Sequence, residues 1–174
     1  MSARSTTGRW ISTLKPSEQA SEHIRFDLGL ATGPLVVRLE QGAVSAIQPA
    51  ATSPDARPAT AQELTSFRAH LEGRAPFMYP FSWAGLTAFQ RQVIEELGRV
   101  PFGQRVSYQE LAQRVGRPRA ARAVGTAMAK NPYPVLYPCH RVVPSSGAIG
   151  QYSFGGPSVK SALLAWEEQQ VGNH

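Results

Sequence analysis

The chain has 174 residues and one cysteine, Cys139. This length allows one large domain or two small ones that share a core. A single cysteine excludes an internal disulfide and is typical of a reducing compartment. Residues 1–20 lack the apolar stretch of a signal peptide, and no apolar run approaches the roughly 20 residues that span a bilayer. We therefore expect no membrane partner and a cytoplasmic protein, nucleoid-associated in a prokaryote or nuclear in a eukaryote.

The basic charge of the chain is concentrated in one segment. The formal net charge is +6. Residues 99–141 hold eight basic residues and one acid, a net of +7, whereas the other ten basic and eleven acidic residues net −1. A basic block inside a balanced chain favours a polyanionic partner, most often nucleic acid. A solvated basic face without a partner is the alternative.

The N-terminal part has the pattern of a small sheet with one helix. Apolar and polar residues alternate, or apolar residues cluster, in three segments predicted as strands: 24–28, 34–39 and 43–47. Residues 49–58 are rich in Pro, Ala and Ser, which predicts a loop. A capping box, Thr60-x-x-Glu63, then opens a helix that ends at Gly73. This part carries no group of residues typical of a chemical site.

The following part is predicted to be helical. A first helix covers 86–97, where glycine and proline follow. A second capping box, Ser107-x-x-Glu110, starts a short helix, and a Gly-Arg-Pro turn separates it from a third helix over 119–129. Two short helices joined by a tight turn form a helix-turn-helix pattern, although any helical hairpin shows a similar one.

In the third predicted helix, Ala, Gly and Thr surround Arg122. Recognition helices in the major groove read base edges with large polar side chains. A helix of small residues instead permits close approach to a narrow groove, where Arg122 could enter the base stack or the minor groove. An Ala-rich core helix with an exposed arginine is the alternative.

Cys139 lies in the tetrapeptide Pro-Cys-His-Arg at 138–141. A lone cysteine is often a small buried hydrophobe. A neighbouring histidine or arginine raises the thiolate fraction, however, so the tetrapeptide also fits a nucleophile. Three prolines within 132–138 predict an extended, rigid approach to this cysteine.

The C-terminal part predicts a hairpin and a helix. Residues 142–143 continue as a strand, 144–147 form a turn, and 148–150 return, which predicts a hairpin wing. A last helix over 159–170 carries Glu167 on its apolar side. Its carboxylate either reaches water or meets a buried partner.

Six blocks of residues occur together in a characteristic order. They are Ser107-Tyr108-Gln109-Glu110-Leu111-Ala112, Ala120-Ala121-Arg122-Ala123-Val124-Gly125, Asn131-Pro132, Pro138-Cys139-His140-Arg141-Val142-Val143, Gly150-Gln151-Tyr152-Ser153 and Leu163-Leu164-Ala165-Trp166-Glu167. In order and spacing they resemble the O6-alkylguanine-DNA alkyltransferases, the direct-reversal DNA repair proteins. The resemblance is strong over 86–167 and weaker, but compatible, before it.

This resemblance implies an α+β protein of three parts. A polar tail at 1–20 would precede an N-terminal α/β domain at 21–80, with a three-stranded, ribonuclease H-like sheet and one helix. A C-terminal winged helix-turn-helix alkyltransferase domain at 81–174 would carry the active site. The protein would bind double-stranded DNA through the minor groove as a monomer, with cooperative binding as an option, and flip O6-alkylguanine or O4-alkylthymine out of the stack. Cys139 would accept the alkyl group in one irreversible turnover, without a metal or cofactor.

The same resemblance implies a role for each site residue. Cys139 would be the nucleophile, His140 its base through a water, Glu167 the group that orients His140, Asn131 the hinge, and Tyr108 a donor to the leaving base. The base pocket would be formed by Tyr108, Met128, Pro134, Cys139, Val142, Tyr152 and Ser153. The DNA contacts would come from Ala121, Arg122, Ala123, Gly125 and Thr126, with Arg122 filling the place of the flipped base.

Two departures from the family pattern stand out. Phe154 precedes Gly155-Gly156, where the family usually continues from Tyr152-Ser153 directly to glycines. This bulky residue falls on the expected pocket loop. The N-terminal part also has no cysteine, so the structural zinc site of some relatives is not expected.

Three other functions are compatible with parts of the sequence. A damage sensor of the same family would bind lesions without transfer, but such proteins typically replace the cysteine by tryptophan. A helix-turn-helix transcription regulator would explain the basic segment but not the Pro-Cys-His-Arg block. A thiol hydrolase would use Cys139 and His140, although their adjacency in sequence makes direct contact awkward.

Overall fold

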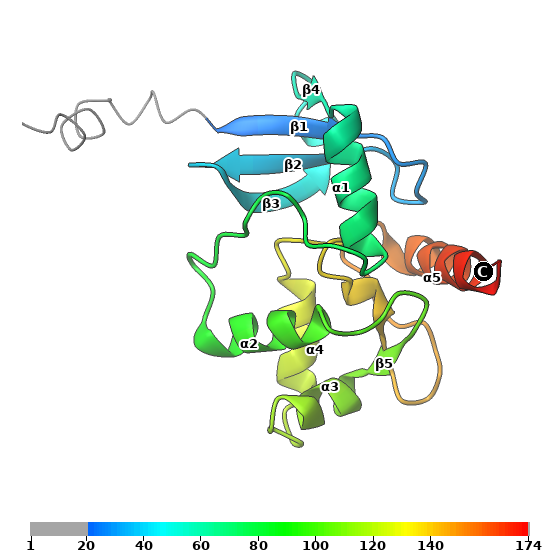
Figure 1. Cartoon of the computed structure of the whole chain (residues 1–174). Coiled ribbons are helices and arrows are strands. Elements are labelled where there is room, and N and C mark those ends of the chain that lie inside the picture. Colours follow the sequence, from blue (N-terminus) through cyan, green and yellow to red (C-terminus); the bar gives the residue numbers. More distant parts are fainter. Residues whose placement is uncertain (1–20, 174) are drawn as a thin grey trace, which may run out of the picture.

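The structure, a computed structural model, describes residues 21–173, so the tail expected at 1–20 lies outside the described residues. A small sheet with one covering helix lies against a group of helices (Figure 1). This arrangement agrees with the predicted α+β class. No helix within the described residues is both long and apolar enough to cross a membrane.

The N-terminal sheet has four strands in the order β3-β2-β1-β4. They are β1 (Glu22–Phe26), β2 (Leu35–Glu40), β3 (Ala43–Pro49) and β4 (Arg57–Pro58). The first three are antiparallel neighbours, whereas β4 pairs in parallel with β1. The three predicted strands are therefore confirmed, but the sheet has a fourth strand that was not predicted, because β4 lies within the segment 49–58 that was expected to be a loop. A 3-10 turn, η2 (Ala50–Thr52), reverses the chain, which then reaches the β1 edge.

Helix α1 (Ala61–Leu71) packs on the sheet, and its predicted capping box is confirmed. The Thr60 hydroxyl accepts a hydrogen bond from the Glu63 N–H at 3.2 Å, and the Glu63 carboxylate accepts one from the Thr60 N–H at 2.8 Å. The same carboxylate accepts two hydrogen bonds from the Arg57 guanidinium, at 2.7 and 2.9 Å. Arg57 thus links β4 to α1, and this contact explains why such a short strand joins the sheet.

The helical part begins with α2 (Ala88–Leu97), α3 (Tyr108–Arg114) and α4 (Ala121–Ala129), which pack against one another. The Ser107 capping box is confirmed, since its hydroxyl accepts from the Glu110 N–H at 3.0 Å. Helix α4 begins two residues later than predicted.

The predicted hairpin wing is wrong. Strand β6 (Val142–Val143) pairs in parallel with β5 (Val106–Ser107), which directly precedes α3, and residues 148–150 form no strand. Gly150 has a φ of 78°, and a Cβ at this position would lie 2.9 Å from Pro144. The chain therefore turns back on itself closely as a loop, and the parallel partner of β6 is the strand that directly precedes α3.

The segment that carries Cys139 also differs from the prediction. Cys139 opens a 3-10 turn, η3 (Cys139–Arg141), and does not lie in an extended strand. The preceding residues are not extended throughout, because the Tyr137 N–H donates to the Tyr133 carbonyl at 2.9 Å and Val135 has a φ of 73°. The prolines are compatible with this turn, and contacts with residues distant in the sequence determine the conformation of the segment.

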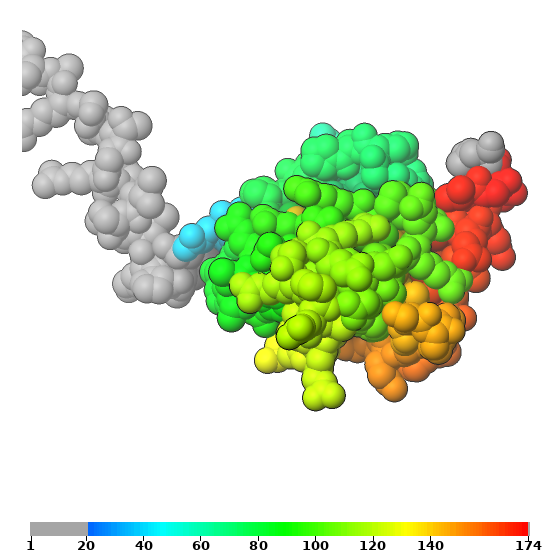
Figure 2. Space-filling model, turned by 90° about the horizontal axis from the view of Figure 1, so that it is seen from below, coloured from blue at the N-terminus to red at the C-terminus, as the bar shows by residue number. Residues whose placement is uncertain are grey.

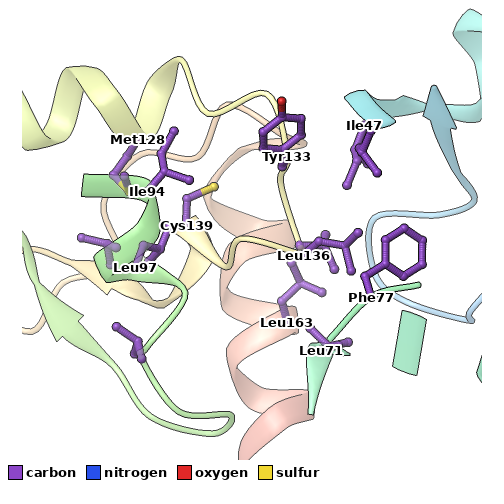
Figure 3. Close-up of a cluster of buried hydrophobic side chains, with 14 of the residues drawn as sticks. Ile47, Leu71, Phe77, Ile94, Leu97, Met128, Tyr133, Leu136, Cys139 and Leu163 are labelled. Carbon is purple, nitrogen blue, oxygen red and sulfur yellow. The ribbon is translucent and has the colours of Figure 1, made fainter. Parts of the chain in front are cut away.

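Helix α5 (Gly156–Gly172) begins three residues before its predicted start, after Gly155 with a φ of 112°. A continuous apolar cluster joins the sheet to the helices. Figure 3 shows Ile47 and Phe77 on one side of this cluster, Leu136 and Leu163 in its centre, and Cys139 on the other side. The cysteine segment therefore lies where the N-terminal and C-terminal parts share their core.

Candidate active site

Cys139 lines a cavity of about 190 Å³. The walls are formed by Tyr108, Gly125, Met128, Ala129, Cys139, Gln151, Tyr152 and Ser153. The structure thus brings together five of the seven expected pocket residues. Pro134 and Val142 are buried but are not part of these walls, because Pro134 lies inside the turn closed by Tyr133 and Tyr137, and Val142 pairs with Val106 in β6.

Cys139 is 5% exposed and is the first residue of η3. Burial raises its pKa, against the opposing effects of a hydrogen bond with Asn131 and the positive charge of Lys160. A thiol in this environment is largely protonated at neutral pH. It therefore needs a base before it can act as a nucleophile.

His140 is placed to be that base. Its Nε2 lies 2.6 Å from Oε1 of Glu167, and both side chains are 1% exposed. Since a carboxylate only accepts hydrogen bonds, Nε2 carries the proton and Nδ1 keeps its lone pair. Within the described residues Nδ1 is buried without a hydrogen-bond partner. Burial lowers the pKa of His140 despite the neighbouring carboxylate, so the ring is neutral and can accept a proton.

Arg141 is a part of this site that sequence reasoning missed. Its guanidinium is 4% exposed and binds Glu167 through contacts of 2.9 to 3.2 Å. It also donates to the carbonyls of Val100 at 2.8 Å and Leu71 at 3.0 Å. Burial would raise the pKa of Glu167, but its bonds to His140 and Arg141 outweigh burial and lower it. The alternative of a buried partner for Glu167 is thus confirmed: its carboxylate contacts the side chains of His140 and Arg141 and accepts a further hydrogen bond from the Gly103 N–H.

Lys160 is the second missed residue. It is 0% exposed and lies on the same side of α5 as Glu167, and its ammonium donates to the Gln151 carbonyl at 3.2 Å. It also lies 5.8 Å from the centre of the Tyr108 ring. Burial lowers the pKa of Lys160, whereas the Cys139 thiol raises it. The sequence held a signal for it, because Lys160 precedes Glu167 by seven residues and therefore shares its helix face.

Three polar side chains complete the surroundings of the thiol. Burial and the nearby thiol raise the pKa of Tyr108, which keeps its phenol protonated. The buried hydroxyl of Tyr152 has no hydrogen-bond partner within the described residues. Asn131 donates to the Tyr137 carbonyl at 2.9 Å and accepts from the Tyr133 N–H at 3.0 Å, so it closes the turn that precedes the cysteine.

Helix α4 presents a surface of small residues beside the cavity. Arg122, Ala123 and Thr126 are exposed, Ala121 and Gly125 are partly buried, and Gly125 also lines the cavity. Figure 2 views the molecule from below, where residues of α3, α4 and the turn between them cover much of the surface. The predicted DNA-contacting residues therefore share one helix at the mouth of the thiol pocket.

Comparison with known proteins shows which family the C-terminal half of this chain resembles. Residues 88–169 match the model of the DNA-binding domain of 6-O-methylguanine DNA methyltransferase. Over this range the chain is similar to the O6-alkylguanine-DNA alkyltransferase family. The matched range contains all six blocks and the whole Cys139 site.

Curated relatives match over the alkyltransferase half of the chain. The methylated-DNA–protein-cysteine methyltransferase of Mus musculus is 60% identical over 86 residues, which are 49% of this chain and 41% of the mouse protein. The protein of the same name from Mycobacterium leprae is 46% identical over 85 residues, 49% of this chain and 51% of that protein. The chain thus spans only about half of the length of these relatives.

Solved alkyltransferase structures extend the similarity to the N-terminal sheet. The Mycobacterium tuberculosis OGT in complex with DNA superposes with a TM-score of 0.69 at 29% identity, covering 86% of this chain and 94% of that one. The O6-methylguanine-DNA methyltransferase of Pyrococcus kodakaraensis gives a TM-score of 0.64 at 27% identity, covering 85% and 99%.

Proposed function

We propose that this protein repairs alkylated DNA by moving the alkyl group from O6 of guanine, and from O4 of thymine, to Cys139. The methylated-DNA–protein-cysteine methyltransferase names of its relatives support this activity. The observation that carries the proposal is the buried arrangement of Cys139, His140 and Glu167 beside a cavity next to α4. No cofactor or metal is assigned a role.

The transfer is a displacement at carbon. The Cys139 sulfur attacks the alkyl carbon, a carbon–sulfur bond forms, and the carbon–oxygen bond breaks with its electrons moving to the guanine. The thiol proton passes through one water to Nδ1 of His140, the nitrogen that keeps its lone pair. Glu167 holds the opposite ring nitrogen and stabilises the imidazolium that forms. The product is a thioether with no group to release it, so each molecule reacts once.

Two groups stabilise charge during this step. The protonated Tyr108 hydroxyl donates to the guanine as negative charge develops on the leaving base. Lys160 brings a positive charge near the sulfur, which favours the thiolate over the thiol. Tyr108 lines the cavity, and the buried Lys160 is held by its hydrogen bond to the Gln151 carbonyl, so little reorganisation is needed during the reaction.

The DNA reaches the thiol across α4. Helices α3 and α4 form a helix-turn-helix, and the small exposed residues of α4 allow close approach to the minor groove of double-stranded DNA. Arg122 occupies the place of the flipped nucleotide. The basic segment neutralises phosphates, and the protein acts as a monomer. The antiparallel β1, β2 and β3 with a parallel edge strand support a ribonuclease H-like description of the sheet.

A transfer assay tests this function. The protein is incubated with a duplex containing O6-methylguanine and with the same duplex without the lesion, and peptides are then mapped by mass. We expect one methyl group on the Cys139 peptide, only with the lesion and not in Cys139→Ala. Binding to the lesion without a change in mass would indicate a damage sensor. Binding of one undamaged sequence regardless of the lesion would indicate a transcription regulator.

A further inference from the structure

The segment that carries Cys139 is held by the N-terminal part of the chain. Hydrogen bonds to this part hold the segment 132–141 along its length. At its start, the Ile47 N–H donates to the Pro132 carbonyl at 2.9 Å, and the Tyr133 hydroxyl donates to the Ser82 carbonyl. In its middle, His70 Nε2 donates to the Leu136 carbonyl at 2.8 Å, and at its end Arg141 donates to the Leu71 carbonyl at 3.0 Å. Each joins residues at least 51 positions apart along the chain. The placement of the nucleophile therefore depends on elements outside the alkyltransferase half.

The middle of this segment is strained. Val135 is 1% exposed and has a φ of 73°, in the left-handed region that a β-branched residue rarely adopts. Such a conformation costs about 1–3 kcal/mol and persists only where the surroundings determine it. Leu136 follows directly, and its carbonyl is the acceptor of the bond from His70. The bond from His70 thus acts on the peptide next to the strained residue, three positions before Cys139.

His70 can make this bond in one protonation state. Its Nδ1 accepts a hydrogen bond from the Phe77 N–H at 3.0 Å, so Nδ1 carries no proton. Nε2 must then hold the single ring proton and donate it to Leu136. In a protonated ring Nδ1 would also carry a hydrogen, which would face the Phe77 N–H in place of the lone pair that accepts from it. The side chain is partly buried at the end of α1 among the rings of Phe77, Phe81 and Tyr137.

We propose that neutral His70 is a positioning residue for the transfer reaction, which holds the 132–138 turn, and with it Cys139, through its Nε2–H bond to Leu136. The proposal rests on the proposed alkyl transfer. It concerns a contact in the N-terminal part of the chain, and His70 touches neither the cavity nor the DNA-facing helix α4. Its effect on the reaction is therefore indirect, through the turn.

The charges around His70 favour its neutral form. Burial lowers its pKa below the ordinary 6.5, the bond to the Leu136 carbonyl opposes this, and the Arg141 charge lowers it further. His70 also lines a second cavity, separate from that of Cys139. The other charged groups that line this second cavity are paired: Glu72 with Arg74 at 2.6 Å, and Arg99 with Glu96 at 3.2 Å. Tyr137 faces the ring as a protonated phenol, since burial raises its pKa. Because the folded pKa is depressed, the contribution of His70 is fully present above pH 6.5 and is lost as the pH falls through its lowered folded pKa.

Two substitutions separate the two bonds of the ring. In His70→Gln the side-chain amide can still donate to Leu136, whereas in His70→Asn the oxygen can still accept from the Phe77 N–H but the donor is lost. Ser66→Ala on the same helix is the matched control, because it removes a 2.9 Å bond to the Met78 N–H that does not involve the cysteine segment. We expect transfer from an O6-methylguanine duplex to slow about tenfold in His70→Asn, the equivalent of one hydrogen bond. His70→Gln and Ser66→Ala should stay within about twofold of the wild type.

Further measurements distinguish positioning from general stability. Labelling of Cys139 by iodoacetamide should rise several-fold in His70→Asn alone, because a loosened turn exposes the thiol, while affinity for undamaged duplex stays unchanged. Below pH 6.5 the transfer rate of the wild type should fall more steeply than that of His70→Gln, which has no ring to protonate. Equal rates in the Asn and Gln variants, or a loss in Ser66→Ala as large as in His70→Asn, would overturn the proposal. If the wild type labels with iodoacetamide but transfers no methyl group, the proposed function fails, and the labelling series still tests the position of Cys139.

Discussion

Glu167→Gln tests the central contact of the candidate site. The carboxylate accepts hydrogen bonds from His140 at 2.6 Å, from Arg141 at 2.9 to 3.2 Å, and from the Gly103 N–H at 3.1 Å. Glutamine has nearly the same shape but no charge and only one accepting oxygen. With that oxygen in the place of Oε2, it accepts from Arg141 and Gly103, and the NH₂ group faces His140. Nε2 of His140 must then accept, and its ring proton moves to Nδ1.

This substitution should have two separable effects. The proton on Nδ1 blocks the nitrogen that would take the thiol proton, and loss of a general base slows a reaction about 100-fold or more. The guanidinium of Arg141, 4% exposed, loses its counter-ion. Breaking a buried ion pair from one side costs about 3 kcal/mol or more. We therefore expect both a slow and a destabilised protein.

The assay measures single-turnover transfer from an O6-methylguanine duplex, at a temperature well below the unfolding midpoint of both proteins, together with unfolding in urea. Glu168→Gln is the matched control, because Glu168 is the next residue, is 54% exposed and pairs with Arg105 at 2.6 Å. An exposed pair contributes about 0–1 kcal/mol, so this variant should behave like the wild type. A Glu167→Gln protein that transfers within about threefold of the wild-type rate would refute the tautomer argument. A stability loss below about 1 kcal/mol would refute the buried pair.

Three further predictions test other parts of the structure. Arg122→Ala should slow transfer from duplex DNA at least about tenfold, because no side chain then occupies the place of the flipped base, while iodoacetamide labelling of Cys139 stays unchanged. Equal losses in transfer and labelling would contradict this role of Arg122. Tyr108→Phe should slow transfer about tenfold without changing the urea midpoint, since one donor to the leaving base is lost; an unchanged rate would remove this residue from the mechanism. Glu63→Gln should destabilise the fold at neutral pH by on the order of 2 kcal/mol, because Arg57 lowers the pKa of Glu63 from 4.5 to about 2. The wild type should lose this stability as the pH falls from 4.5 toward 2, and urea unfolding across that range should show no such loss in the variant.

Local signals in the sequence predicted much of the fold. Both predicted capping boxes, at Thr60 and Ser107, are present, because each needs only residues three positions apart. The pattern of the last helix correctly placed Glu167 on the same side as Leu163, and both are buried, although the sequence left open whether the carboxylate reaches water or a buried partner. The six family blocks, taken together, placed Cys139, Tyr108 and Tyr152 in one pocket, although no local pattern joins residues so far apart.

The features that were predicted wrongly depend on distant partners. β4 joins the sheet through Arg57 and its bonds to Glu63 on α1, and β6 pairs with β5, 36 residues earlier, as the register of Val106 with Val142 shows. Neither pairing leaves a periodic signal in strands of two residues. Arg141 was counted with the basic face for the same reason, since the groups that bury it lie 26 to 70 positions away.

The buried charges explain how one carboxylate can serve both stability and reactivity. Glu167 contacts both Arg141 and His140, so the guanidinium already balances its negative charge. Without that balance, the carboxylate would draw a proton onto His140 and the base would be occupied before the reaction begins. With it, burial keeps the ring neutral, and the carboxylate fixes the proton on Nε2. In the proposed mechanism Arg141 therefore helps His140 to remain a base, and its position directly after His140 in η3 makes the two contacts to Glu167 part of one turn.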